Sequence, residues 1–328
     1  MSELTVPAHG ASLPPEVALG LLDAPTSSPT IPAMKAVWTA LVALTTAITM
    51  PAHALAFGDD LGSRGLGMGG AGRADARGDQ ALAMNPSGMS LARLYTIQSH
   101  YQYVTRDGGH LGQVSIVDST SAFNLAGGVY YTYRKASPAG IPSLSGHEGG
   151  VALSMPLGPY LMIGATGKYL RLSTGWLEPN GTEPRGGFTA DAGLTIRPTA
   201  ILTLAVVGYN LRDLSTRQAP VGLGYGASLI PVPEVSFAVD LFHDFTTSDP
   251  TRGTRLSIAV GSEYTMSQRL AVRLGGGREG VLQHGYVSGG VAALSEMGAL
   301  DFSFRQDVSG QAKQTVAVVA VRLFVPQP

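Results

Sequence analysis

Histidines and their carboxylate neighbours are the residues of this sequence best suited to chemistry. Of the seven histidines, two precede residue 57 and the others are His100, His110, His147, His243 and His284. None of them belongs to a His-x-x-x-His or glutamate-containing pattern that would hold zinc. His243-Asp244 could be half of a hydrolytic triad, but no Gly-x-Ser-x-Gly nucleophile motif accompanies it. A lipase or protease is the enzyme-class alternative, and the sequence predicts no enzyme, no metal site and no cofactor.

The overall composition excludes several other classes of function. Charged residues make up 14% of the chain and the net charge is −1, whereas a soluble protein has about 25% charged residues. Nucleic-acid binding needs a concentrated basic surface, so no nucleic-acid partner is expected. Cysteine is absent, which removes thiol catalysis, zinc–thiolate sites and disulfides. Glycine is abundant, at 43 of 328 residues.

The first part of the chain has the pattern of an export signal. Residues 1–33 contain no Lys or Arg and indicate a disordered leader or a start placed too early. Residues 34–56 combine Lys35, an uncharged apolar run and small-x-small sites such as Ala54-Leu55-Ala56. The apolar run is short for a spanning helix and breaks at Pro51. We therefore predict a cleaved signal peptide at 34–56.

Alternating segments of about ten residues recur from residue 94 to residue 325. In LDFSFR at 300–305, three apolar residues alternate with Asp, Ser and Arg. A period of two with one apolar face indicates a half-buried strand. About fourteen such runs can be counted, near 94–105, 110–118, 121–134, 147–156, 159–172, 186–197, 200–211, 220–230, 233–245, 254–264, 269–276, 283–294, 297–306 and 314–324.

The connections between these runs alternate between short and long. Short turns such as 198–199 and PVP at 231–233 alternate with longer connections at 135–146, 173–185, 212–219 and 246–253. A transmembrane barrel has this alternation, because its periplasmic turns are short and its outer loops longer. The sequence therefore predicts an all-β fold, a transmembrane antiparallel barrel of about fourteen strands over 94–325. A secreted β-protein with an ordinary core is the alternative.

Residues 57–93 stand before the first strand and are the material available to fill the lumen. A barrel of about fourteen strands is wider than its own side chains can fill. Glycine permits the tight, irregular backbone that a plug needs. Asp79 can cap a helical turn through QALAM, and Pro86 should end that turn at Asn85. We predict a hatch on the periplasmic side of the lumen, with a flexible linker as the alternative.

These residues resemble the start of the FadL-type outer-membrane transporters of hydrophobic compounds. SRGLGMGGAGRA followed by DQALAMNPSGM resembles the family's glycine-rich segment, acidic residue, alanine-rich turn and Asn-Pro element. The resemblance implies a hatch inside a fourteen-stranded barrel. The hatch residues it implies are Gly69, Gly70, Asp79, Asn85, Pro86, Ser87 and Gly88. The PorV-like barrels of a secretion system have a similar opening segment.

Two further groups of residues are candidate sites. The inward positions carry interleaved charges, which predicts mutual pairing across the wall: Lys168, Asp191, Arg197, Asp240, Arg255, Glu263, Arg269, Arg273, Asp301 and Arg305. As a functional alternative, Arg269 and Arg273 lie on one face near a turn and could hold a substrate carboxylate. In the third strand, Gly127-Gly128 marks a possible bulge. The family resemblance implies a lateral gap there, with ordinary tapering as the alternative.

The expected function follows from the resemblance. It implies an outer-membrane channel of a Gram-negative-type bacterium for passive uptake of hydrophobic small molecules such as long-chain fatty acids. The alternative is a PorV-like barrel that docks secretion or assembly partners and transports nothing. The expected partners are outer-membrane lipid, a hydrophobic small-molecule ligand and the barrel-assembly machinery, and the barrel is expected to be a monomer.

Overall fold

The computed structural model describes residues 60–106, 108–120, 124–137, 143–173, 185–214, 216, 219–249, 253–280, 283–310 and 313–325. The leader predicted at 1–33, the signal peptide predicted at 34–56 and the first residues of the predicted hatch lie outside these ranges. No helix among the described residues is long and apolar enough to cross a membrane.

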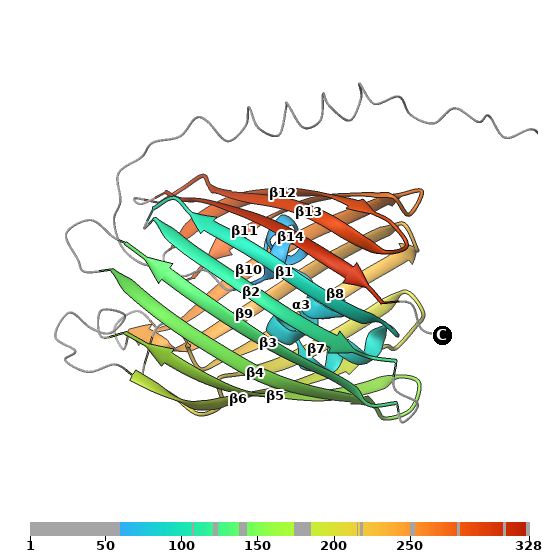
Figure 1. Cartoon of the computed structure of the whole chain (residues 1–328), viewed down its shortest axis with the longest axis horizontal. Coiled ribbons are helices and arrows are strands. Elements are labelled where there is room, and N and C mark those ends of the chain that lie inside the picture. Colours follow the sequence, from blue (N-terminus) through green and yellow to red (C-terminus); the bar gives the residue numbers. More distant parts are fainter. Residues whose placement is uncertain are drawn as a thin grey trace, which may run out of the picture. The chain divides into compact units, whose positions relative to one another are not determined.

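Fourteen antiparallel strands form a closed barrel (Figure 1). Each strand pairs with its neighbours in the sequence, and β14 closes the ring on β1 through pairs such as Gln98 with Arg322. The prediction of a closed barrel of about fourteen strands is confirmed. The strands are β1 Tyr95–Val104, β2 Gly109–Asp118, β3 Ala126–Ala136, β4 Leu144–Pro156, β5 Leu161–Leu172, β6 Arg185–Ile196, β7 Leu202–Tyr209, β8 Gly222–Val232, β9 Val235–Asp249, β10 Gly253–Met266, β11 Leu270–Glu279, β12 His284–Leu294, β13 Gly298–Asp307 and β14 Thr315–Phe324.

Two strand boundaries differ from the sequence-based ones. β3 begins at Ala126 and not at 121, because Asn124 has a positive φ of 56° that a strand does not accommodate. β9 continues to Asp249 and β10 begins at Gly253, so these strands include 246–249 and 253 of the connection expected at 246–253. A register shift between Gly253 and Arg255 permits this extension. We call the end of the barrel beyond β1, β3 and β5 the loop end, and the opposite end, where β14 finishes, the turn end.

The alternation of side chains follows the pleat of the strands. In β1, inward residues from Thr96 to Val104 are buried while the residues between them are half-buried or exposed. The outward residues of the other strands are largely aliphatic or aromatic, as in Val114, Val151 and Val319. A closed ladder satisfies every backbone group within the wall, so that an apolar outer surface can face lipid.

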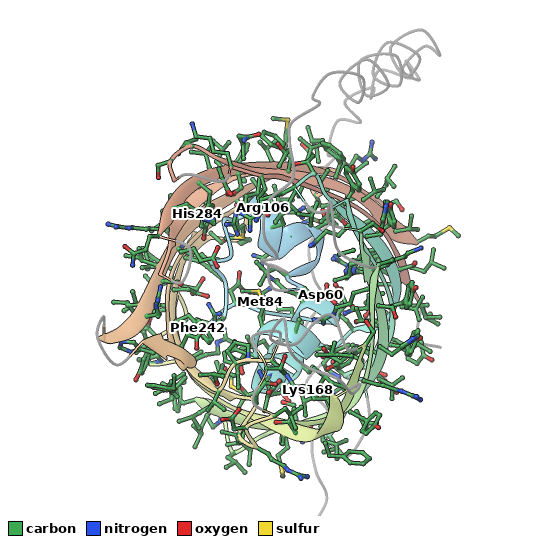
Figure 2. All side chains as sticks on the ribbon, turned by 90° about the vertical axis from the view of Figure 1, so that its left-hand side faces the viewer. Asp60, Met84, Arg106, Lys168, Phe242 and His284 are labelled. Carbon is green, nitrogen blue, oxygen red and sulfur yellow. The ribbon has the colours of Figure 1, made fainter. Side chains whose placement is uncertain are left out.

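Residues 60–93 lie inside the ring of strands (Figure 2). We call residues 60–93 the N-terminal segment. It contains α2 Gly62–Gly67, α3 Asp79–Met84 and the 3-10 helix η1 Pro86–Leu91. Pro86 leaves Asn85 in an extended conformation and thereby ends α3, as expected. Asp79 differs from the prediction: it is the first residue of α3 and makes no cap, because Gly78 holds the cap position.

Glycines on the inner wall allow the N-terminal segment to approach the strands at backbone distance. A Cβ at Gly164 would lie 2.5 Å from the Pro86 carbonyl carbon and 2.7 Å from Ser87 Cα. At Gly226 it would lie 2.9 Å from the backbone nitrogen of Ala74. We call inward glycines at which an added Cβ would lie within 3 Å of an atom of the N-terminal segment the seat glycines; they include Gly128, Gly164, Gly193, Gly226, Gly261 and Gly275.

Gly128 belongs to this set, and its position corrects the expectation of a lateral gap at Gly127-Gly128. The ladder between β2, β3 and β4 runs through both residues without a register shift. A Cβ at Gly128 would lie 2.7 Å from Leu82 Cδ2 of α3. The glycine therefore makes room for a side chain of the N-terminal segment, and the wall is continuous beside it.

We predict that Gly164→Ala loosens the N-terminal segment while the barrel still forms. The added methyl group meets backbone atoms of Pro86 and Ser87, and such overpacking costs about 1–3 kcal/mol. Limited proteolysis of the folded protein should then cleave within residues 60–93 faster than in the parent. Gly167→Ala on the same strand is the matched control, because a Cβ there has no neighbour within 4 Å. Equal cleavage rates in the two variants would contradict the close packing of the N-terminal segment against Gly164.

Candidate functional site

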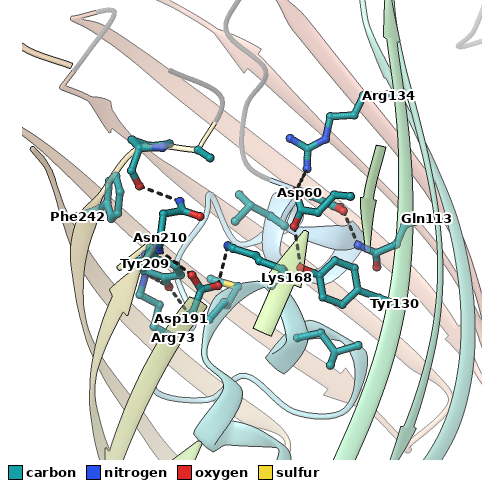
Figure 3. A pocket seen from close by; sticks show the side chains of 17 residues that line it. Asp60, Arg73, Gln113, Tyr130, Arg134, Lys168, Asp191, Tyr209, Asn210 and Phe242 are labelled. Atoms are coloured by element: carbon teal, nitrogen blue, oxygen red, sulfur yellow. Dashed lines mark hydrogen bonds and ion pairs between the residues drawn. The ribbon is translucent and has the colours of Figure 1, made fainter. Parts of the chain in front are cut away.

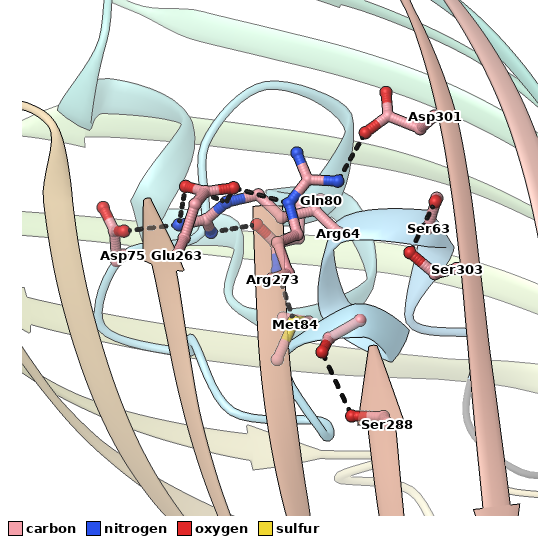
Figure 4. A network of polar contacts seen from close by, with 11 residues as sticks. Ser63, Arg64, Asp75, Gln80, Met84, Glu263, Arg273, Ser288, Asp301 and Ser303 are labelled. Carbon is pink, nitrogen blue, oxygen red and sulfur yellow. Dashed lines mark hydrogen bonds and ion pairs between the residues drawn. The ribbon is translucent and has the colours of Figure 1, made fainter. Parts of the chain in front are cut away.

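Arg64 of α2 is the centre of a buried polar network in the lumen (Figure 4). Its Nη2 lies 2.8 Å from Asp75 Oδ2, and its Nε donates to Glu263 of β10 at 3.1 Å. Its Nη1 donates to Gln80 Oε1 at 2.7 Å. Burial alone would lower the pKa of Arg64, but Glu263 and Asp75 outweigh burial and raise its pKa. The guanidinium is therefore a permanent cation that ties the N-terminal segment to the wall.

Arg273 of β11 extends this network along the wall. Its Nε lies 2.5 Å from Glu263 Oε2 and its Nη1 lies 2.6 Å from Asp301 Oδ1. Its side chain is 3% exposed. Each buried cation thus has carboxylates of the chain as partners, which is the condition for tolerating charge in a desolvated place.

The two arginines predicted to hold a substrate carboxylate are not brought together. Arg269 is exposed in the turn between β10 and β11, where its backbone nitrogen donates to Met266. Arg273 points into the lumen and its guanidinium already binds two carboxylates. The difference arises because the strand begins at Leu270, so Arg269 does not follow the alternation that buries Arg273. The arrangement does not support a two-arginine clamp.

A second attachment joins the N-terminal segment to β9. Asp240 Oδ2 accepts hydrogen bonds from the backbone nitrogens of Gly72 and Arg73 at 3.1 and 2.9 Å. Arg73 Nη1 lies 3.0 Å from the same oxygen, and its Nε donates to the Tyr209 hydroxyl at 2.8 Å. One carboxylate of the wall therefore fixes both the backbone and the side chain of Arg73.

The Asn-Pro element makes a third attachment, near the turn end. Asn85 is fully buried, and its Nδ2 donates to the Arg73 carbonyl and to Thr195 Oγ1 of β6, both at 2.8 Å. Its Oδ1 accepts from the backbone nitrogen of Ser87 at 3.2 Å, which caps η1. Ser154 Oγ of β4 donates to the Ser87 carbonyl at 3.0 Å. Asn85 thus links two parts of the N-terminal segment to the wall.

The other implied hatch residues have local roles. Gly69 and Gly70 have positive φ values of 69° and 84° and form the turn after α2. The Tyr286 hydroxyl donates to the Gly69 carbonyl at 2.8 Å. Gly88 lies against the Ala76 backbone, which leaves no room for a side chain. Asp79 pairs with Arg322 of β14 at 2.8 Å.

Asp60 attaches the start of the described segment. Its Oδ1 lies 2.7 Å from His100 Nε2 of β1, and its Oδ2 accepts from Gln113 and from Thr132. Burial alone would raise the pKa of Asp60. The His100 and Arg134 charges and the hydrogen bonds outweigh burial, so that the pKa lies below the ordinary 3.8. The ionised carboxylate is therefore the form that holds this end in place.

A cavity opens on the loop-end side of α3 (Figure 3). Leu61, Leu82 and Met84 of the N-terminal segment and Phe242 of β9 give it apolar lining. Its polar side chains are mostly paired with one another: Lys168 Nζ lies 2.8 Å from Asp191, and Glu148 accepts from Arg134 at 2.8 Å and from Tyr130 at 2.7 Å. The cavity thus combines an apolar floor with a polar wall whose charges are balanced.

Mutual pairing accounts for most of the inward charges. Ion pairs join Lys168 to Asp191 and Arg73 to Asp240, and Arg273 pairs with both Glu263 and Asp301. Arg305 lies 3.3 Å from Glu279. Sequence reasoning missed Arg64 and Arg73, which form ion pairs between the N-terminal segment and the wall. Their signal was two basic residues inside a glycine-rich stretch, facing acidic residues on predicted strands. No group of three or more His, Asp or Glu suited to a metal ion occurs in the described part of the chain.

We predict that Asn85→Ala releases the N-terminal segment without preventing barrel formation. The substitution leaves the Arg73 carbonyl and the Ser87 nitrogen without their partner, and each such loss costs about 1–3 kcal/mol. The measurement is the resting ion leak of the protein in planar bilayers, with heat-modifiable gel mobility as the check on folding. Asn85→Gln is the companion variant: it keeps the amide but moves it by one methylene, and it should leak as well. A folded Asn85→Ala variant with no added leak would refute the role of Asn85.

A pH dependence follows from Asp60. A depressed carboxyl pKa contributes stability above the unfolded value of 3.8, and this contribution is lost as the pH falls through the folded pKa. Protease sensitivity around residue 60 should therefore rise as the pH falls below about 4. Asp60→Asn should remove this acid-dependent step. A variant that keeps the step would show that another group causes it.

The fold has counterparts among solved structures, although no protein-family model and no curated protein matches the sequence. The P. putida toluene transporter TodX is 14% identical, with a TM-score of 0.65 over 82% of this chain and 100% of that chain. The Ralstonia pickettii toluene transporter TbuX is 14% identical, with a TM-score of 0.61 over 81% of this chain and 100% of that chain. A Pseudomonas aeruginosa FadL homologue is 11% identical, with a TM-score of 0.57 over 80% of this chain and 98% of that chain. At these identities the likeness establishes the fold alone: the chain forms a closed barrel whose fold is similar to that of these three structures.

Proposed function

We propose that this protein is an outer-membrane channel for the passive uptake of small hydrophobic molecules. The observation that carries the proposal is the cavity on the loop-end side of the N-terminal segment, with Leu82, Met84 and Phe242 in its lining. Concave sites with apolar lining and a few polar groups are the usual places for small ligands. The proteins of similar fold include two toluene transporters, which favours compact apolar substrates. Uptake of long-chain fatty acids, which the sequence resemblance implies, stays a prediction.

The N-terminal segment is the proposed hatch of this channel. It lies across the lumen, with α2 against β11–β14, α3 against β1–β3 and η1 against β4–β6. Its attachments through Arg64, Arg73 and Asn85 hold it in that position. A molecule that enters the cavity from the loop end meets α3 as its floor, and further passage requires a shift of the N-terminal segment. The opposing attachments make the closed state the resting state.

One observation favours a second candidate function, a barrel that docks secretion or assembly partners. The ladder is continuous across β2, β3 and β4, so the wall offers no lateral exit at Gly127-Gly128. A wall without a lateral exit at this place suits a protein that presents its surface to other proteins. Transport predicts uptake of a hydrophobic solute and docking predicts none, so one uptake assay distinguishes the two functions.

We predict that the purified protein carries toluene into proteoliposomes and that deletion of residues 57–89 converts it into an ion-conducting pore. The deletion removes α2, α3 and the start of η1 from the lumen, and a barrel of fourteen strands is too wide for its own side chains to fill. Single-channel conductance in planar bilayers measures the opening. Gly167→Ala, which keeps the N-terminal segment, is the control for purification and reconstitution. A deletion variant that folds and conducts no better than the parent would exclude the hatch. Toluene uptake equal to that of protein-free liposomes would favour the docking function.

A further inference from the structure

The outward side chains of β1–β5 change in character toward the loop end. Along β3, the outward residues toward the loop end change from Val129 through Tyr131 and Tyr133 to Lys135. β1, β2, β4 and β5 repeat the change from aliphatic or small residues to polar aromatic or cationic ones. Their outward residues near the loop end are Tyr101, Tyr103, His110, His147, Tyr169 and Arg171. This order is the one expected where a strand leaves the hydrocarbon and reaches the headgroups.

The strand register brings the polar members of this surface together. His110 is the cross-strand partner of Lys135, and His147 is the partner of both Tyr133 and Arg171. Directly opposed residues have Cβ atoms about 5 Å apart. Lys135 and Arg171 therefore stand on the two strands that flank β4, with His147 between them.

Tyrosine hydroxyls orient both imidazoles. The Tyr131 hydroxyl lies 2.7 Å from His147 Nδ1, and the Tyr101 hydroxyl bonds His110 Nδ1 in the same way. The rings of Tyr133 and Tyr103 lie 5.1 and 5.2 Å from those of His147 and His110. When the hydroxyl donates to Nδ1, Nε2 carries the ring proton and can donate to an acceptor outside the protein.

The two cations have no counter-charge in the described part of the chain. Lys135 and Arg171 are exposed, and no ion pair or hydrogen bond joins either side chain to another described residue. The lumen differs in this respect, because Lys168 and Arg134, on the same two strands, each pair with a carboxylate at 2.8 Å. An unmatched positive surface at the headgroup level of a membrane is complementary to an anionic lipid.

We propose that this surface, formed by Lys135, Arg171, His147 and His110, is a binding site for the anionic phosphate of a membrane lipid headgroup. The guanidinium and ammonium groups supply charge-assisted hydrogen bonds to phosphate oxygens, and the imidazole Nε2–H groups supply further donors. The tyrosines below them pack against the start of the acyl chains. The proposal rests on the membrane location of the proposed function and is independent of transport.

The test uses the full-length protein in phosphatidylcholine vesicles that contain spin-labelled lipid. Electron paramagnetic resonance compares the immobilised fractions of spin-labelled phosphatidic acid and spin-labelled phosphatidylcholine. The parent protein should prefer phosphatidic acid, and Lys135→Gln/Arg171→Gln should lower this preference by about fivefold for each cation removed. Arg278→Gln/Lys313→Gln is the matched control, because it removes two exposed cations from β11 and the connection before β14 and should keep the preference.

The outcomes separate this proposal from the proposed function. An equal loss of preference in both double variants would show that net charge alone acts, and an unchanged preference in Lys135→Gln/Arg171→Gln would show that the surface binds no phosphate. Either result would overturn the proposal and leave the channel proposal standing. If neither spin-labelled lipid is immobilised by the parent protein, the chain does not span the bilayer, and both proposals fail. Heat-modifiable gel mobility of every variant verifies that the barrel has formed.

Discussion

The close approach of the N-terminal segment to the inner wall is the constraint on which the remaining structure depends. Side chains at Gly164, Gly193 or Gly275 would collide with backbone or side-chain atoms of residues 68–87. Because these wall positions are glycine, the backbone of the N-terminal segment can lie directly against the strands. The wall glycines therefore permit this close packing. The cavity on the loop-end side of α3 exists because α3 is held in a fixed position in the lumen.

Electrostatics then selects one position for the N-terminal segment. Arg64 and Arg73 bring two cations into a desolvated lumen, and Glu263 and Asp240 of the wall neutralise them at 3.0 Å. Removing one partner from such a pair leaves a buried charge without compensation, at a cost of about 3–5 kcal/mol. A segment shifted along the lumen would break both pairs together. The lumen is thus polar but balanced, whereas no described residue pairs with Lys135 or Arg171 on the outer wall.

The sequence predicted the local features of the fold and missed the non-local ones. The period of two and the Asn85-Pro86 break identified fourteen strands and the end of α3, because both depend on residues adjacent in the chain. The pair of Arg73 with Asp240 joins residues 167 positions apart and depends on strand tilt and register, which alternation does not specify. The dipeptide Gly127-Gly128 alone is compatible with a kink in the strand and with close packing of the N-terminal segment. The short distance from a Cβ at Gly128 to the Leu82 side chain decides for close packing. Arg269 and Arg273 are an even number of residues apart, so strand alternation would place both side chains on one face. Arg269 lies in a turn, where this alternation does not apply.

A disulfide cross-link tests most directly the claim that the N-terminal segment is seated inside the lumen. The chain has no cysteine, and the hydroxyl oxygens of Ser63 in α2 and Ser303 in β13 lie 3.0 Å apart. We predict that Ser63→Cys/Ser303→Cys forms an intramolecular disulfide on mild oxidation of the folded protein. Ser63→Cys/Ser99→Cys should form none, because Ser99 faces outward on β1. Failure of the first pair to cross-link, or equal cross-linking of both pairs, would contradict the account.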